Sequence, residues 1–255
     1  MSRRPHATTL MSDFRFARQP RWLVGHIVAL VAIVLFVNLG MWQLRRHDEF
    51  AALDARLEAR LSADPLTLDA AGQMPVDEVD LHRVTATGKY DLAGEIILQA
   101  RSFKGRSGHN VLTPLVGADG TAVLVNRGWV PIDIEGPPVV GAEPPPGEVT
   151  IVGVAQDTEV RQGLGPVDPA TGGLERVSRV DLERIGAQSD YPLESFYLQL
   201  VSPEPQGGFP LVLDPPEPGS GPPNLSYAIQ WFAFTGVVAI GYPLLLRSTA
   251  RKQQP

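Results

Sequence analysis

Hydrophobic positions are gathered into two uninterrupted runs, one near each end of the chain, with a polar, Pro- and Gly-rich stretch between them. The first run, residues 22–42 (WLVGHIVALVAIVLFVNLGMW), contains no Asp, Glu, Lys or Arg, and neither does the second, residues 227–246 (YAIQWFAFTGVVAIGYPLLL). A helix rises about 1.5 Å per residue, so each run can cross a hydrocarbon core of about 30 Å. The pattern therefore predicts two transmembrane helices.

A cleaved signal peptide is the main alternative for the first run. Such peptides have an apolar core of about 7–15 residues followed by a cleavage site made of small residues. The run here is longer, and the sequence that comes after it, GMWQLRR at 40–46, offers no site of that kind. We therefore expect the segment to remain as an anchor.

Charge indicates how the two helices are oriented. The intervening stretch 45–226 carries 14 Lys/Arg and 27 Asp/Glu, a net charge of −13, whereas both flanking tails are basic. Short basic tails favour the cytoplasm, while a long domain can be translocated whatever its charge. We expect a multi-pass protein of the plasma membrane with both termini in the cytoplasm. Its parts are a basic tail (1–21), a first transmembrane helix (22–44), an extracytoplasmic domain (45–226), a second transmembrane helix (227–246) and a short tail (247–255).

The extracytoplasmic domain is predicted to begin as a helix and continue as a β-sheet. Leu53, Leu57 and Leu61 are four residues apart and share one face of a helical stalk over 48–61, which we expect to pack against the domain. From about residue 81 to 214 short β-branched runs alternate with turn residues, which predicts an antiparallel sheet or a barrel in a β-rich, α+β domain. A short helix is expected at 180–185, and strands at 82–90, 95–101, 111–115, 122–126, 148–155, 195–201 and 211–213.

Composition removes several kinds of chemistry. The chain has no cysteine, which excludes disulfides, thiolate metal sites and a cysteine nucleophile. Its five histidines are scattered, and it contains no Gly-x-Ser-x-Gly elbow, phosphate-binding glycine loop or His-Glu-x-x-His pair. We therefore expect a protein that is not an enzyme, with no catalytic residues and no metal site.

Polar residues inside the apolar runs are the first candidates for function. His26 could ligate haem iron through a neutral imidazole, or it could reach water or a lipid head group near the membrane surface. Asn38, Gln43 and Gln230 lie near the opposite ends of the two runs. Their amides could hydrogen-bond the neighbouring helix or line a cofactor cavity.

The string NRGWVP at 126–131 is the second candidate. Arg127 could bind a carboxylate such as a haem propionate, and Trp129 could lie on a surface that faces the membrane or a partner. The alternative is a corner after a strand, in which Gly128 permits a bend and Trp129 fills the core.

These motifs, taken in order, resemble the surfeit locus protein 1 family, whose members are assembly factors for cytochrome c oxidase. The resemblance rests on GMWQLRR (40–46), RVTATGKY (83–90), VLTPL (111–115), VLVNRGWVP (123–131) and YAIQWF (227–232). It implies a protein that assists haem delivery or insertion into the oxidase's catalytic subunit, with haem a as cofactor. Many members have a proposed haem-ligating histidine shortly before the last motif. Asn224 stands at that position here, and an amide does not replace imidazole as an iron ligand.

We therefore expect an assembly factor whose partners are the oxidase catalytic subunit or a haem a synthase, with membrane lipid around it and no nucleic acid. The alternative is a membrane-anchored extracytoplasmic binding or structural module without a haem role. The residues expected at the cofactor are His26 and Arg127. Those expected at a partner-facing or membrane-level surface are Trp42, Gln43, Arg46, Trp129, Tyr227, Gln230 and Trp231.

Overall fold

The computed structural model describes residues 15–252 except 135, 162, 164, 206 and 220. The tail predicted for residues 1–21 therefore lies mostly outside the described residues, as do residues 253–255. The chain divides into two compact units: a helical unit made of the chain up to Ala55 together with Gly219 onward, and a β-rich unit, Arg56–Pro218.

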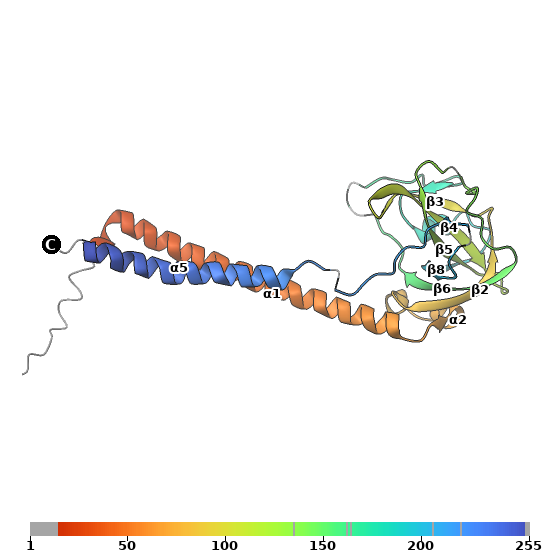
Figure 1. Cartoon of the computed structure of the whole chain (residues 1–255). Helices are drawn as coiled ribbons and strands as arrows, with labels where there is room; N and C mark the ends of the chain where they lie inside the picture. Colours follow the sequence, from red (N-terminus) through yellow and green to blue (C-terminus); the bar gives the residue numbers. More distant parts are fainter. Residues whose placement is uncertain are drawn as a thin grey trace, which may run out of the picture. The chain divides into compact units, whose positions relative to one another are not determined.

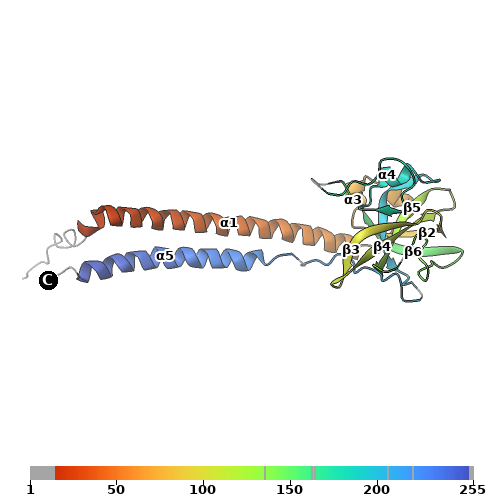
Figure 2. The same cartoon turned by 90° about the horizontal axis from the view of Figure 1, so that it is seen from above.

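Two long helices form the helical unit. After a short 3-10 turn, η1 (Arg15–Arg18), helix α1 runs from Pro20 to Ser62 without a break and crosses into the second unit. Helix α5 (Asn224–Lys252) runs antiparallel beside the N-terminal part of α1, and it continues through Pro243 (Figures 1 and 2). Both helices are long and apolar enough to cross a membrane by length and composition.

The contact between α1 and α5 follows one stripe of buried and half-buried side chains on α1. The residues of α1 that are buried or half-buried recur every three or four positions, as expected for one helix face. At Gly40 the Phe232 ring lies so close that an added Cβ would be 2.8 Å from its carbons. The stripe on α1 is Ala29, Ile33, Phe36, Gly40 and Gln43.

The β-rich unit is an eight-stranded sheet that closes on itself. Its strand order is β1-β2-β6-β8-β5-β4-β3-β7, and an additional β2–β4 pairing joins the ends of a five-stranded ring (Figures 1 and 2). The strands are β1 (Leu66–Thr67), β2 (Arg83–Tyr90), β3 (Ile96–Phe103), β4 (Arg106–Val116), β5 (Ala122–Pro131), β6 (Glu148–Gln156), β7 (Arg176–Val177) and β8 (Leu193–Ser202).

The sheet differs from the antiparallel one expected from sequence in three pairings. Strands β5 and β8 are parallel, and so are β1 with β2 and β3 with β7. A parallel pair needs a crossover rather than a hairpin, and strand β6, which lies between β5 and β8 in the chain and pairs antiparallel with β8, brings the chain back to the end of the sheet where β8 begins. The strand expected at 211–213 is not a strand, because only Leu211 pairs, in an isolated bridge with Trp129.

Side-chain alternation along the strands builds the core. Phe196, Leu198 and Leu200 of β8 point into the closed sheet, and Tyr197 points to the other face, towards helix α4 (Leu182–Gly186). Two short helices that the sequence pattern did not indicate, α2 (Leu68–Gly72) and α3 (Val76–Val79), cover one end of the core. Ala71 and Val79, one from each, are fully buried.

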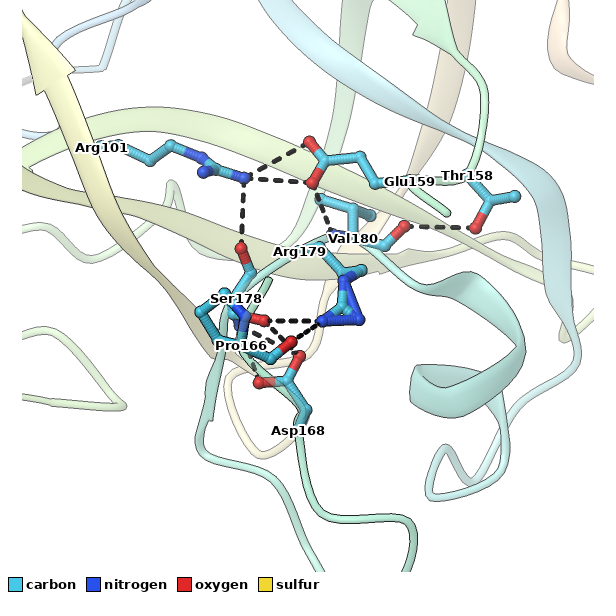
Figure 3. Close-up of polar contacts among 8 residues, drawn as sticks. All are labelled: Arg101, Thr158, Glu159, Pro166, Asp168, Ser178, Arg179 and Val180. Atoms are coloured by element: carbon cyan, nitrogen blue, oxygen red, sulfur yellow. Dashed lines mark hydrogen bonds and ion pairs between the residues drawn. The ribbon is translucent and has the colours of Figure 1, made fainter. Parts of the chain in front are cut away.

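A polar cluster fastens the long segment between β6 and β8 to the end of β3. Figure 3 shows Arg101 facing Glu159, with their charged groups 3.1 Å apart. The same carboxylate accepts a hydrogen bond from the Val180 amide at 3.2 Å. In the same cluster, Asp168 accepts from the Ser178 amide and hydroxyl, and Arg179 donates to the Pro166 carbonyl (Figure 3). These side chains provide hydrogen-bond partners for backbone groups of a segment that has little regular backbone pairing of its own.

Candidate functional site

Six of the seven residues predicted for a partner-facing surface, all except Trp129, lie at one end of the helix pair. We call this region the Trp42 end, defined as residues 42–46 of α1 and 224–231 of α5. Trp42 and Tyr227 are 51% and 48% exposed, and Gln230 is also exposed. Gln43 and Trp231 are half-buried between the helices. The predicted set therefore divides into outward residues that can contact a partner and inward residues that hold the pair together.

Aromatic rings fix the geometry of the pair just beyond the Trp42 end. Phe36 of α1 lies with its ring centroid 5.6 Å from Trp231 and 5.8 Å from Phe234. The Trp231 and Phe234 rings are themselves 5.8 Å apart and nearly perpendicular. Such clusters bury large areas with few free rotamers, so the helices meet here in a defined arrangement.

Two buried amides at the Trp42 end have unused hydrogen-bonding capacity. Asn224 is 5% exposed, and its Nδ2 is buried without a hydrogen-bond partner among the described residues. The Oε1 of Gln43 is in the same condition. One group is a donor and the other an acceptor, and each costs free energy when buried unpaired.

A shallow hollow also lies on the exposed side of α1 at the Trp42 end. It has a volume of about 270 Å³ and is lined by Trp42, Arg45, Arg46 and Glu49. Arg46 pairs with Glu49 at 3.1 Å and lies 4.9 Å from the centre of the Phe50 ring, with its side chain still 50% exposed. A guanidinium so exposed can change partners at little cost, which suits it to contact another molecule.

His26 is held inside the helix pair by both ring nitrogens. Its Nδ1 lies 2.8 Å from the Tyr242 hydroxyl, and its Nε2 lies 3.1 Å from the Ala17 carbonyl. A carbonyl oxygen can only accept, so Nε2 carries the proton and Nδ1 accepts from the tyrosine. An iron ligand would need one of these nitrogens free.

Arg127 lies in the other unit, where it is enclosed. Its Nη2 is 2.6 Å from the Glu95 carboxylate, and the two side chains are 3% and 0% exposed. The Arg127 Nε donates to the Thr113 hydroxyl at 2.8 Å, and that hydroxyl donates to Glu95 at 3.0 Å. Arg127 Nη1 donates to the Ala142 carbonyl at 2.6 Å. The guanidinium is thus occupied by partners inside the domain.

The Glu95–Arg127 pair also organises the backbone around it. Arg127 is the extra residue of a β-bulge, since Asn126 pairs with Leu112 and Gly128 with Val111. Glu95 accepts from the Val139 amide at 2.8 Å, so the pair holds the loop around 136–142 against the sheet. Burial raises the pKa of the neighbouring Tyr90 to about 12, with the charge of Arg127 opposing that rise.

Trp129 does not lie on a surface, and this part of the sequence interpretation is corrected. Its side chain is fully buried, and the indole Nε1 donates to the Arg101 carbonyl at 3.2 Å. Gly128, with φ at +132°, lies so close to the Leu211 carbonyl that an added Cβ would clash with it. Because β5 continues to Pro131 instead of ending in a corner, Trp129 remains inside the sheet.

His26, Arg127 and Asn224, the residues considered for haem a, do not fit it as a bound cofactor. Both His26 nitrogens are in hydrogen bonds, a propionate at Arg127 would have to displace Glu95, and Asn224 carries no imidazole. His26, Arg127 and Asn224 therefore do not form a haem site.

The sequence patterns did not indicate Glu95 as the partner of Arg127 or Tyr242 as the partner of His26. Glu95 opens an apolar run and Tyr242 lies four residues before the end of one, so neither stood out as the partner of a distant residue. The pairings join positions 32 and 216 residues apart in the chain, and local patterns do not show contacts of that kind.

The structure therefore defines a class: a β-domain protein carried by two long apolar helices, whose aromatic, amide and arginine side chains gather at one end of the helix pair. Comparison with known families agrees with the resemblance noted from the motifs. The model of the SURF1 family matches residues 30–236, and the chain belongs to this family.

Relatives match the chain over most of its length. It is 29% identical to a SURF1-like protein of Mycobacterium bovis over 258 residues, which cover 96% of this chain and 91% of that protein. It is 26% identical to surfeit locus protein 1 of Homo sapiens over 241 residues, covering 88% and 78%. Surfeit locus protein 1 of Mus musculus is 32% identical over 51% of this chain and 47% of its own.

Proposed function

We propose that this protein is a membrane-anchored assembly factor for cytochrome c oxidase that assists haem insertion into the catalytic subunit. The single observation that carries the proposal is membership of the SURF1 family across residues 30–236. Two helices long and apolar enough to span a bilayer support an anchored protein. The charge distribution supports a plasma-membrane protein with cytoplasmic termini and an extracytoplasmic β-rich domain.

The protein acts by docking and not by carrying haem on His26 or Arg127, because both side chains are occupied within the chain. The docking surface is the outward part of the Trp42 end, namely Trp42, Arg46, Tyr227 and Gln230. An amphipathic, aromatic surface at the boundary between lipid and water suits a membrane-embedded partner, either the oxidase catalytic subunit or a haem a synthase.

Deletion of the gene tests the proposal. Assembled oxidase and its haem a absorbance should fall, while other respiratory complexes stay at their normal level, and the wild-type gene should restore both. An unchanged oxidase spectrum in the deletion strain would refute the role in assembly. It would leave a membrane-anchored binding or structural module as the alternative.

Complementation with matched variants tests the docking surface. Tyr227 and Val237 are both exposed on α5, at 48% and 69%, but only Tyr227 belongs to the Trp42 end. Tyr227→Ala should restore less oxidase than wild type, and Val237→Ala should restore it fully at equal protein level. The protein is also purified from cells that make haem a and its Soret absorbance is recorded. His26→Ala should leave this absorbance unchanged, because His26 is not expected to bind iron.

A further inference from the structure

A second stripe of side chains runs along α1 on the side turned away from α5. Its members alternate at spacings of three and four residues, and all of them are exposed. Val24, Val31 and Asn38 occupy one position of a seven-residue repeat, and Ile27, Val34 and Met41 occupy the other. A repeat of 3.5 residues is the pattern by which two helices pack along a common seam.

Asn38 is the unusual member of this stripe. Its Nδ2 donates to the Val34 carbonyl one turn earlier at 2.7 Å, and this is the only hydrogen bond of its side chain within the described part of the chain. The amide has a further N–H and an acceptor oxygen. It lies at the edge of a hollow of about 460 Å³ that is otherwise lined by Leu30, Val31, Val34 and Leu35. Lipid tails can fill this hollow but cannot hydrogen-bond the amide.

We propose that this stripe is the interface with a second copy of the same chain, with the two Asn38 side chains hydrogen-bonded to each other. Two copies inserted in the same orientation place Asn38 at the same depth in both, so a matching donor and acceptor is always opposite. A single Asn among apolar residues at one repeat position is the feature that fixes the register of packed helices, at a cost in stability. The inference rests on the membrane placement of α1 proposed above.

The dimer leaves the helix pair intact. The residues that contact α5 include Phe36 and Gly40, which lie on a different face of α1 from Val34 and Asn38. The stripe also ends at Met41, one turn before Arg45. A second copy therefore covers an apolar face that α5 does not cover and need not displace the aromatic cluster.

Single-cysteine crosslinking of the full chain in membranes tests this, because the natural chain has no cysteine. Val31→Cys and Val34→Cys should give disulfide-linked dimers on mild oxidation. Val28→Cys and Val37→Cys are matched controls, since both valines are exposed on α1 but lie off the stripe. Their yields should be much lower, so that crosslinking follows the repeat.

Asn38→Val, added to Val34→Cys, should lower the dimer association constant by about 3- to 10-fold, the range expected for a side-chain hydrogen bond between helices in a membrane. Asn38→Gln should retain association, because it keeps the amide. Equal yields at all four cysteine positions, no dimer, or linkage only to a different protein would overturn the inference. Release of the chain from membranes by alkaline carbonate would refute the membrane placement of α1 on which the dimer rests. A membrane-bound monomer with normal oxidase assembly would refute the dimer alone.

Discussion

Two arginines, each in a short motif that contains a tryptophan, have opposite surroundings in the two units. Arg46 has a side chain that is 50% exposed and pairs with Glu49 three residues away on the same helix. Arg127 is 3% exposed and pairs with Glu95 across the sheet. The comparison shows that burial and partners separate an arginine that maintains a fold from one that is free to contact another molecule. Substitution of Arg127 or its partner should therefore lower the stability of the fold, whereas substitution of Arg46 should affect contact with another molecule.

The largest effect is expected when one member of the buried pair is removed. Glu95→Ala leaves the Arg127 charge in the core without its counter-ion and should lower the free energy of unfolding by about 3–5 kcal/mol. Equilibrium denaturation of the full chain in detergent measures this loss. Hydrogen exchange of the β4 and β5 amides in the same variant locates it. Arg127→Ala should be comparably destabilising.

Replacing both members together provides the control. Glu95→Leu combined with Arg127→Met removes both charges and fills similar space, so it should recover most of the stability that either single change loses. If the double variant were as unstable as Glu95→Ala, the Arg127 bonds to Thr113 and Ala142 would be the main contribution instead of the ion pair.

The next effect concerns the helix pair. Gly40→Ala places a methyl group where the Phe232 ring stands, 2.8 Å away, and the resulting overpacking should destabilise the α1–α5 contact by about 1–3 kcal/mol. Thermal unfolding of the chain in detergent reports this as a lower midpoint. Gly236 and Gly241 of α5 are matched controls because nothing lies within 4 Å of an added Cβ, and their alanine variants should unfold at or above the wild-type midpoint.

A smaller effect is expected from pH. Burial, followed by the charge of Arg60, lowers the pKa of His82 below its usual 6.5, and burial with Arg176 does the same for His109. Above pH 6.5 both are neutral in the folded and unfolded chain. Below pH 6.5 the unfolded chain takes up protons first, so stability should fall until the folded pKa values are reached.

The pH effect is measured as the free energy of unfolding of the full chain between pH 7.5 and a lower pH at constant ionic strength. His82→Gln together with His109→Gln should flatten the slope in this window. Burial also raises the pKa of Asp80 above 3.8, which acts in the opposite direction at more acidic pH and should remain in the double variant. An unchanged slope would assign the pH dependence to other groups.

The elements that were predictable from sequence are those with a local period. Apolar runs without charge gave both long helices, and alternation gave six strands to within a few residues at most ends. The helices α2 and α3, five and four residues long, were missed, whereas α4, also five residues long, was expected at 180–185; elements this short show too little of a 3.6-residue period to be predicted consistently. The parallel β5–β8 pairing depends on contacts between distant segments, which a local pattern does not carry.

The candidate site was predictable only as a set of residue types. Nothing in the sequence around Arg127 distinguishes an enclosed guanidinium from an exposed one, because Glu95 and Thr113 come from other parts of the chain. The amides were expected either to join the two helices or to line a cofactor cavity, and the structure places only Gln43 between α1 and α5, while Asn38 and Gln230 are exposed. A helix rotation decides which face each one occupies, and that rotation depends on the packing of Gly40 and the aromatic cluster.

The smallest effect on stability is expected at the exposed arginine. Arg46→Gln removes a surface ion pair and should change the free energy of unfolding by no more than about 1 kcal/mol. The same variant should nevertheless restore less oxidase to the deletion strain than wild type does. Arg56→Gln, at another exposed arginine of α1, should restore it fully. Low oxidase at a normal level of the Arg46→Gln protein would then result from lost contact with a partner and not from misfolding. Full restoration by Arg46→Gln would show that Arg46 is not part of the docking surface.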